Sequence, residues 1–79
     1  MANEQRIQRL KEILEMEPDD SFTRYALGLE YFRTRELQSA IDEFDIVIER
    51  DKKYLPAYHQ LAQVLGRLNR TQGAKKVYR

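Results

Sequence analysis

Residues of similar size recur along the chain at an interval of 34 positions, and this recurrence constrains the fold more than any other feature. Small residues fall on small ones, and bulky apolar residues fall on bulky apolar ones. The matched pairs are Leu27 with Leu61, Gly28 with Ala62, Tyr31 with Leu65, Ala40 with Ala74, and Phe44 with Tyr78. A fixed period of about 20 to 50 residues is typical of chains that stack one supersecondary unit repeatedly. We therefore expect a repeat architecture.

Apolar residues recur at helical spacing within each unit, and no stretch alternates in the manner of a half-buried strand. Pro18 disfavours helix at the residue before it, and Asp20 or Ser21 is suited to cap the helix that follows. Pro56 suits a first helical turn, and Asn69 can adopt a left-handed turn conformation. The sequence predicts an all-α fold of antiparallel helix pairs, with about five helices over residues 3–16, 22–34, 37–49, 56–68 and 72–79.

Gly28 lies in the middle of the second predicted helix, where glycine costs about 1 kcal/mol relative to alanine. That cost is explained if another helix must approach closely at this point. Ala62 repeats the small residue one unit later. These positions predict packing between helices and not a site of chemistry.

The residues at these positions resemble the tetratricopeptide repeat (TPR) family. The resemblance rests on "LGLEY" with Ala40 and Phe44, and on "LPAYHQLAQVL" with Ala74 and Tyr78. It implies a TPR-like α-solenoid that forms a single domain over residues 1–79. Residues 1–19 resemble the end of a preceding repeat, 21–54 a full repeat, and 55–79 a second repeat that is incomplete at its C-terminal end. Arg24 departs from the family by replacing an aromatic residue, and Arg35 by replacing the usual turn glycine.

Besides the face that bears Leu27, Gly28 and Tyr31, the same predicted helix has a second apolar stripe. It is formed by Phe22, Tyr25, Leu29 and Phe32. In TPR proteins the first helices of successive repeats line a groove that holds peptides, and the resemblance places this stripe in that groove. The candidate partner-binding residues are Phe22, Tyr25, Leu29, Phe32, Arg33, His59, Gln63 and Arg67. Two alternatives stay open from the sequence: neighbouring helices of the same chain bury the stripe, or a second copy of the chain covers it in a homodimer.

The charges are distributed unevenly. Residues 1–51 hold all 13 acidic residues and 7 of the 14 Lys and Arg residues, a net charge of −6, and residues 52–79 hold the other 7 and no acid, a net charge of +7. The cluster near Tyr78, formed by Arg67, Arg70, Lys75, Lys76 and Arg79, has the character of a phosphate-binding surface. Binding of nucleic acid or another anionic partner is therefore the alternative function, although the acidic half would repel nucleic acid.

The sequence provides little for catalysis or cofactor binding. There is no cysteine, and one histidine, His59, cannot form a metal site by itself. "EPDDS" is too short for a calcium-binding loop. We predict no catalytic residue, no metal and no cofactor. No apolar run approaches a membrane span, and no signal-peptide core is present, so we expect a cytoplasmic protein without membrane contact. The predicted function is a non-enzymatic scaffold or adaptor that binds a protein or peptide.

Overall fold

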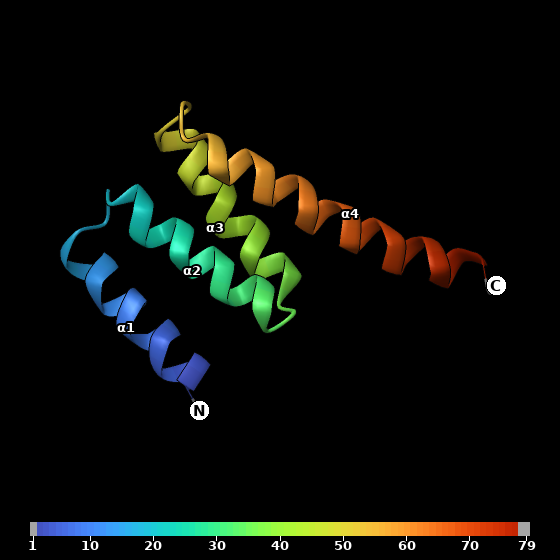
Figure 1. Ribbon diagram of the computed structural model, residues 1–79, viewed down its shortest axis with the longest axis horizontal. Helices are drawn as coiled ribbons and strands as arrows, with labels where there is room; N and C mark the ends of the chain where they lie inside the picture. The colour runs from blue at the N-terminus through green and yellow to red at the C-terminus, as the bar shows by residue number, and fades with distance from the viewer. Residues whose placement is uncertain (1, 78–79) are drawn as a thin grey trace.

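The computed structural model describes the backbone of residues 2–77 and the side chains of residues 4–70. The described residues form four helices: α1 (Ala2–Met16), α2 (Ser21–Arg33), α3 (Leu37–Arg50) and α4 (Leu55–Val77) (Figure 1). No strand occurs among these residues. The predicted all-α class is confirmed, with four helices in place of about five.

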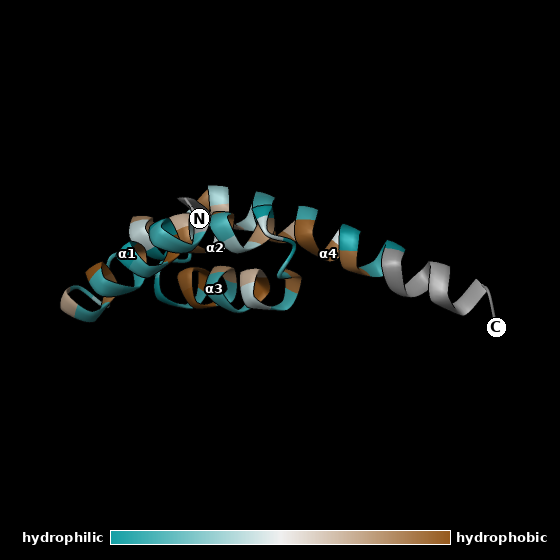
Figure 2. Ribbon diagram, turned by 90° about the horizontal axis from the view of Figure 1, so that it is seen from below, coloured by the Kyte–Doolittle hydropathy of each residue, from teal (hydrophilic) through white to brown (hydrophobic). Residues whose placement is uncertain are grey.

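Each helix packs against the next in chain order, and consecutive helices run antiparallel (Figure 1). A smaller contact joins α2 to α4. Seen from the side, α2 and α4 lie in one layer and α3 lies in the other (Figure 2). The Cα atoms extend over 47 × 33 × 14 Å. None of the helices in the described part of the chain combines the length and the apolar character that crossing a membrane requires.

The predicted start of α2 is confirmed at Asp20, which occupies the N-cap position. Its carboxylate accepts hydrogen bonds from the backbone N–H of Thr23 at 3.5 Å and from the Thr23 hydroxyl at 2.7 Å. One of the orphan donors of the first turn is thereby satisfied. The loop before Asp20 is fixed by Arg24 and Arg50, which both donate to the carbonyl oxygen of Pro18. These contacts orient α2 between α1 and α3.

Helices α2 and α3 approach each other closely at Gly28, as the sequence predicts. A Cβ atom added to Gly28 would lie 2.6 Å from the Phe44 ring of α3. Phe44 is fully buried in a cluster with Ala40, Ile41 and Val64. Only glycine lets this ring lie against the backbone of α2, so the helix-propensity cost at Gly28 is offset by packing.

The turn between α2 and α3 ends α2 in a Schellman motif. The backbone N–H of Glu36 donates to the carbonyl of Tyr31 at 2.9 Å, and the N–H of Arg35 donates to that of Phe32 at 3.1 Å. This motif needs a left-handed residue after the cap, and glycine usually supplies it. Arg35 stands there instead, with φ of 64°. The departure from the family pattern therefore leaves the turn intact but strained.

The predicted turn at residues 69–71 is wrong, because α4 continues as one helix from Leu55 to Val77. Asparagine costs only a fraction of a kcal/mol in a helix, and neither proline nor glycine occurs at 69–71 to stop it. The roles predicted for the side chains of Ala74 and Tyr78 lie outside the described residues.

Two glycines provide a matched test of the packing at the α2–α3 contact. Gly28→Ala should destabilise the protein by about 1–2 kcal/mol, because overpacking against a buried ring outweighs the gain in helix propensity. Gly66→Ala in α4 should stabilise it by up to about 1 kcal/mol, because no neighbouring atom lies within 4 Å of the added Cβ. Urea unfolding followed by circular dichroism measures both. Equal effects of the two substitutions would contradict the close approach at Gly28.

The strain at Arg35 gives a second prediction. Arg35→Gly should raise the free energy of unfolding by about 1 kcal/mol, because glycine adopts the left-handed conformation without the steric penalty of a Cβ. For a domain of this size that gain corresponds to a rise in Tm of about 4–8 °C. Calorimetry measures the change. An unchanged or lowered Tm would mean that the arginine side chain stabilises the turn by more than its backbone strain costs.

Candidate functional site

A hollow at the C-terminal end of α2 is lined by Phe32, Arg33, Arg35 and Arg67, and has a volume of about 290 Å³. Three of these residues, Phe32, Arg33 and Arg67, belong to the predicted partner-binding set. They come from two helices, α2 and α4, that are separated in sequence by α3. We refer to these four residues as the arginine pocket. It is open to solvent and has room for a side chain, not for a drug-sized molecule.

Arg67 is positioned over the ring of Phe32. The centre of its guanidinium lies 5.2 Å from the ring centroid, which is within the range of a cation–π contact. Phe32 is half-buried and packs against the core cluster. Because this packing holds the ring in place, it also fixes the position of the Arg67 guanidinium above it. The contact leaves the planar guanidinium at the wall of the pocket, where carboxylate and phosphate groups are its best partners.

Arg33 is held by a buried carboxylate. Glu30 is only 3% exposed, and its Oε2 atom accepts from Nη1 of Arg33 at 3.2 Å and pairs with Nε of Arg6 at 3.4 Å. Its Oε1 atom is buried without a hydrogen-bond partner among the described residues. Arg33 itself is exposed, with 64% of its side chain accessible. Glu30 therefore orients one arginine of the pocket and also neutralises part of its charge.

Sequence reasoning missed two residues of this site, Arg35 and Glu30. Arg35 was visible as an arginine at a turn position that favours glycine, which is an unexpected place for a bulky side chain. The sequence does not indicate that Glu30 is buried, because a glutamate between apolar residues on an amphipathic helix is usually solvated. With both included, three arginines line the pocket with Phe32, and the buried carboxylate of Glu30 pairs with one of them, Arg33.

The predicted stripe divides into buried and exposed members. Tyr25, Leu29 and Phe32 pack against the core cluster of the same chain. The Tyr25 ring lies 5.7 Å from that of Phe44 and 5.4 Å from that of Tyr54. Burial raises the pKa of the Tyr54 phenol above its usual value. The alternative that the chain itself buries the stripe is therefore right in part, and Tyr25 and Leu29 contribute more to the core than to a free surface.

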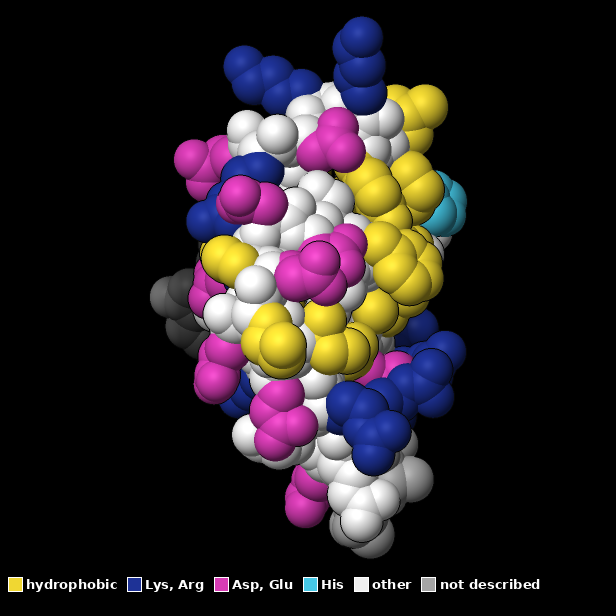
Figure 3. Space-filling view, turned by 90° about the vertical axis from the view of Figure 1, so that its left-hand side faces the viewer, with side chains coloured by type: hydrophobic (Ala, Val, Ile, Leu, Met, Phe, Trp, Pro, Cys, Tyr) yellow, Lys and Arg dark blue, Asp and Glu magenta, His cyan; other side chains and the backbone are white. Residues whose placement is uncertain are grey.

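Phe22 is the exposed end of the stripe, with 68% of its surface accessible, and Leu55 at the start of α4 is 72% exposed. Figure 3 views this end of the molecule and shows hydrophobic side chains gathered in a band along one side, with Lys and Arg side chains above and below it. His59 and Gln63 are exposed on α4 and do not line the arginine pocket. The α2–α4 side thus has an apolar end at Phe22 and a basic end at the arginine pocket.

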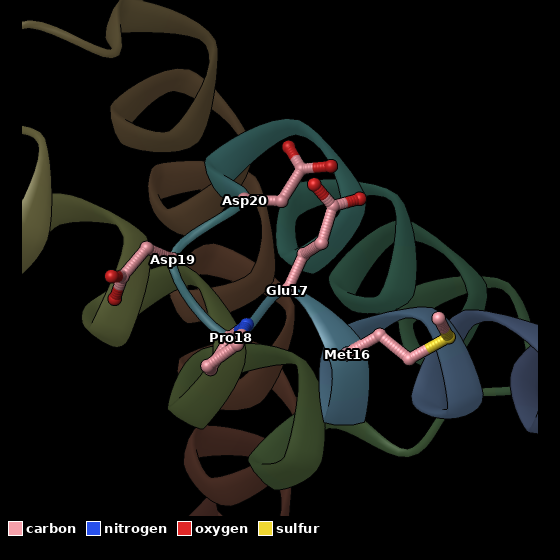
Figure 4. A pocket seen from close by; sticks show the side chains of 5 residues that line it. All are labelled: Met16, Glu17, Pro18, Asp19 and Asp20. Carbon is pink, nitrogen blue, oxygen red and sulfur yellow. The ribbon is translucent and has the colours of Figure 1, made fainter.

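A second hollow lies at the α1–α2 loop and is lined by Met16, Glu17, Pro18, Asp19 and Asp20 (Figure 4). The carboxylates of Glu17 and Asp20 point to the same side of the loop, and that of Asp19 points away from them (Figure 4). Asp19 pairs with Arg50 at 3.2 Å. The hydrogen bond from the Thr23 hydroxyl lowers the pKa of Asp20, as a capping carboxylate requires. This loop uses its charges to fix the backbone, so we assign it no ligand.

Within the described residues, no group of three or more His, Asp and Glu side chains is placed to hold a metal ion. The arginine pocket provides cationic donors and an aromatic wall, which bind an anionic group but do not transfer protons at neutral pH. No family model, curated protein or solved structure matches the chain.

Because Tyr25 is packed and Phe22 is exposed, replacing each with alanine should change the free energy of unfolding by different amounts. Tyr25→Ala should lower the free energy of unfolding by about 2–3 kcal/mol, because it removes ring contacts with Phe44 and Tyr54. Phe22→Ala should change it by no more than about 0.5 kcal/mol, because the side chain is mostly solvated. Thermal unfolding of both variants measures the difference. A large loss of stability in Phe22→Ala would show that the exposed end also supports the fold.

Proposed function

We propose that the chain is a non-catalytic interaction module of the tetratricopeptide type that binds an acidic segment of a partner protein along the α2–α4 side. The observation that carries this proposal is the convergence of Phe32, Arg33 and Arg67 on one pocket, with Arg35 added by the turn. A pocket of side-chain size with three guanidinium groups fits the carboxylate of a Glu or Asp residue. The 34-residue repeat and the antiparallel helices support the family resemblance.

The length of the α2–α4 side suggests the form of the ligand. Phe22 and Phe32 are ten residues apart on one helix, which corresponds to about 15 Å. An extended peptide covers that distance in about four to five residues. The proposed ligand therefore carries an apolar side chain for the Phe22 end and a carboxylate for the arginine pocket, separated by about four residues. Burial of the apolar side chain supplies affinity, and the carboxylate supplies orientation.

The test is fluorescence anisotropy with short labelled peptides that hold Leu and Glu at that separation, compared with peptides in which Gln replaces Glu. Arg33→Gln and Arg67→Gln should each weaken binding of the Glu peptide about five- to tenfold, because each removes a charge-assisted contact. Neither should change binding of the Gln peptide. Equal affinity for the two peptides, or no binding by folded wild-type protein, would refute the proposal.

Two further variants separate binding from folding in the same assay. Arg35→Gly removes a charge from the pocket but relieves backbone strain, so it should bind the Glu peptide more weakly while being more stable. Glu30→Gln keeps the size of the side chain and removes the charge that neutralises Arg33, so it should bind the Glu peptide more tightly. Affinities that follow stability and not pocket charge would contradict an electrostatic site.

Nucleic acid remains the second candidate, because three arginines also match phosphate groups. A labelled single-stranded oligonucleotide in the same assay distinguishes the two. Affinity for the oligonucleotide that exceeds affinity for the Glu peptide and falls steeply with salt would favour nucleic acid. The acidic residues of the first 51 positions favour a protein partner, because they repel a polyanion beyond the pocket.

A further inference from the structure

Glu30 of α2 is the only charged side chain that is buried within the described part of the chain, with 4% of its surface accessible. Its Oε1 atom is buried and accepts no hydrogen bond from the described residues. A buried carboxylate with an unpaired oxygen destabilises the folded state unless nearby cations compensate for its charge. The stability of this part of the fold therefore depends on the cations that lie beside Glu30.

Two guanidinium groups supply that compensation, and both lie beside the same oxygen. Oε2 of Glu30 is 3.2 Å from Nη1 of Arg33 and 3.4 Å from Nε of Arg6. The side chain of Arg33 is 64% exposed and that of Arg6 is 66% exposed, so either can turn towards another anion in solvent. Because the two like charges repel each other at one acceptor, a closer pair of Glu30 with one arginine loosens its pair with the other.

The two ion pairs depend on different parts of the fold. Arg33 follows Glu30 by three residues on α2, so their pair can form wherever this helix is intact. Arg6 belongs to α1, which lies at one edge of the row of helices and packs against α2 but against no other described helix (Figure 1). The pair between Arg6 and Glu30 therefore exists only while α1 is docked on α2.

We infer, on the basis of the proposed function, that Arg6 is a positioning residue for the arginine pocket and that docking of α1 thereby strengthens anion binding. Arg6 does not line the pocket. It compensates part of the charge of Glu30, and so leaves Arg33 available to a carboxylate of the ligand. Without Arg6, Glu30 pairs with Arg33 alone and neutralises it more completely. The buried carboxylate is thus the link between the edge helix α1 and a pocket formed by α2, the turn after it and α4.

The same link should operate in the opposite direction, because coupling between two binding equilibria is reciprocal. A ligand carboxylate that draws Arg33 away from Glu30 leaves Arg6 as the partner of the buried charge. Helix α1 should then dock more firmly on α2. Hydrogen exchange of the backbone amides in the middle of α1 measures this, and saturation with the Glu peptide should slow it about threefold. Exchange in α1 that is unchanged or faster in the bound state would contradict the coupling.

The sharing of Glu30 is testable without any ligand, by nuclear magnetic resonance of the arginine side chains. Arg6→Gln should raise the order parameter of the Arg33 Nε–H group, because Glu30 then holds Arg33 alone. Arg9→Gln is the matched control, since Arg9 is exposed on the same helix and does not pair with Glu30. It should leave Arg33 unchanged. An order parameter of Arg33 that does not respond to Arg6→Gln, or responds equally to Arg9→Gln, would overturn the inference whether or not the peptide binds.

The effect on binding is measured by fluorescence anisotropy with the Glu and Gln peptides, on variants whose helix content is checked by circular dichroism. Arg6→Gln should weaken binding of the Glu peptide about threefold and leave the Gln peptide unaffected, whereas Arg9→Gln should weaken it by less than about 1.5-fold. Arg6→Lys keeps the charge and should restore most of the affinity. In a Glu30→Gln background, Arg6→Gln should have no effect, because the shared carboxylate is gone.

The outcomes separate this inference from the proposed function. A folded wild type that does not bind the Glu peptide would refute the proposed function itself. Binding that Arg6→Gln and Arg9→Gln weaken equally would leave the proposed function standing and reject the role of Arg6. An effect of Arg6→Gln that persists in the Glu30→Gln background would reject the route through Glu30. Should Glu30→Gln fail to fold, the comparison of Arg6→Gln with Arg9→Gln in both assays decides the inference.

Discussion

The contact between Gly28 of α2 and the Phe44 ring of α3 fixes the arrangement on which the other features depend. Because the ring lies against the backbone of α2, the two helices approach more closely than side chains on both would allow. Phe44 also touches the ring of Tyr25, which in turn touches that of Tyr54 at the entry to α4. This row of three aromatic side chains thus links α2, α3 and the loop that leads into α4. The spacing of these helices positions the end of α2 relative to α4, where Arg33 and Arg67 line one pocket.

The two ends of the α2–α4 side differ in chemistry. At the helix starts, apolar residues such as Phe22 and Leu55 extend beyond the core. The C-terminal end of α2 has arginines at its surface, and the buried carboxylate of Glu30 pairs with Arg33. Under the proposed function, this polarity would favour one direction for a bound segment. The orientation of a bound segment would then follow from charge, and its affinity from the apolar end.

The helical class, the N-cap at Asp20 and the close approach at Gly28 could be predicted, because each depends on residues within a few positions or on a repeated size pattern. The burial of Tyr25 could not, because spacing on one helix shows which residues share a face but not whether a neighbour covers it. The continuity of α4 was missed since an asparagine permits a turn without requiring one. The pocket was found only in part: Phe32, Arg33 and Arg67 lie on the two helices predicted to line the groove, whereas Arg35 joins them through the backbone of a turn.

The left-handed Arg35 has a consequence for how this chain would respond to selection in the laboratory. A screen for thermostability alone would favour glycine at position 35, since the Schellman turn prefers it. The same substitution would remove one of the three cations around the pocket. Stabilised descendants would therefore melt at a higher temperature while the proposed binding of an anion became weaker, and a melting curve alone would not reveal that weakening. Position 35 is thus the place where consensus design on turn geometry would weaken the proposed anion binding.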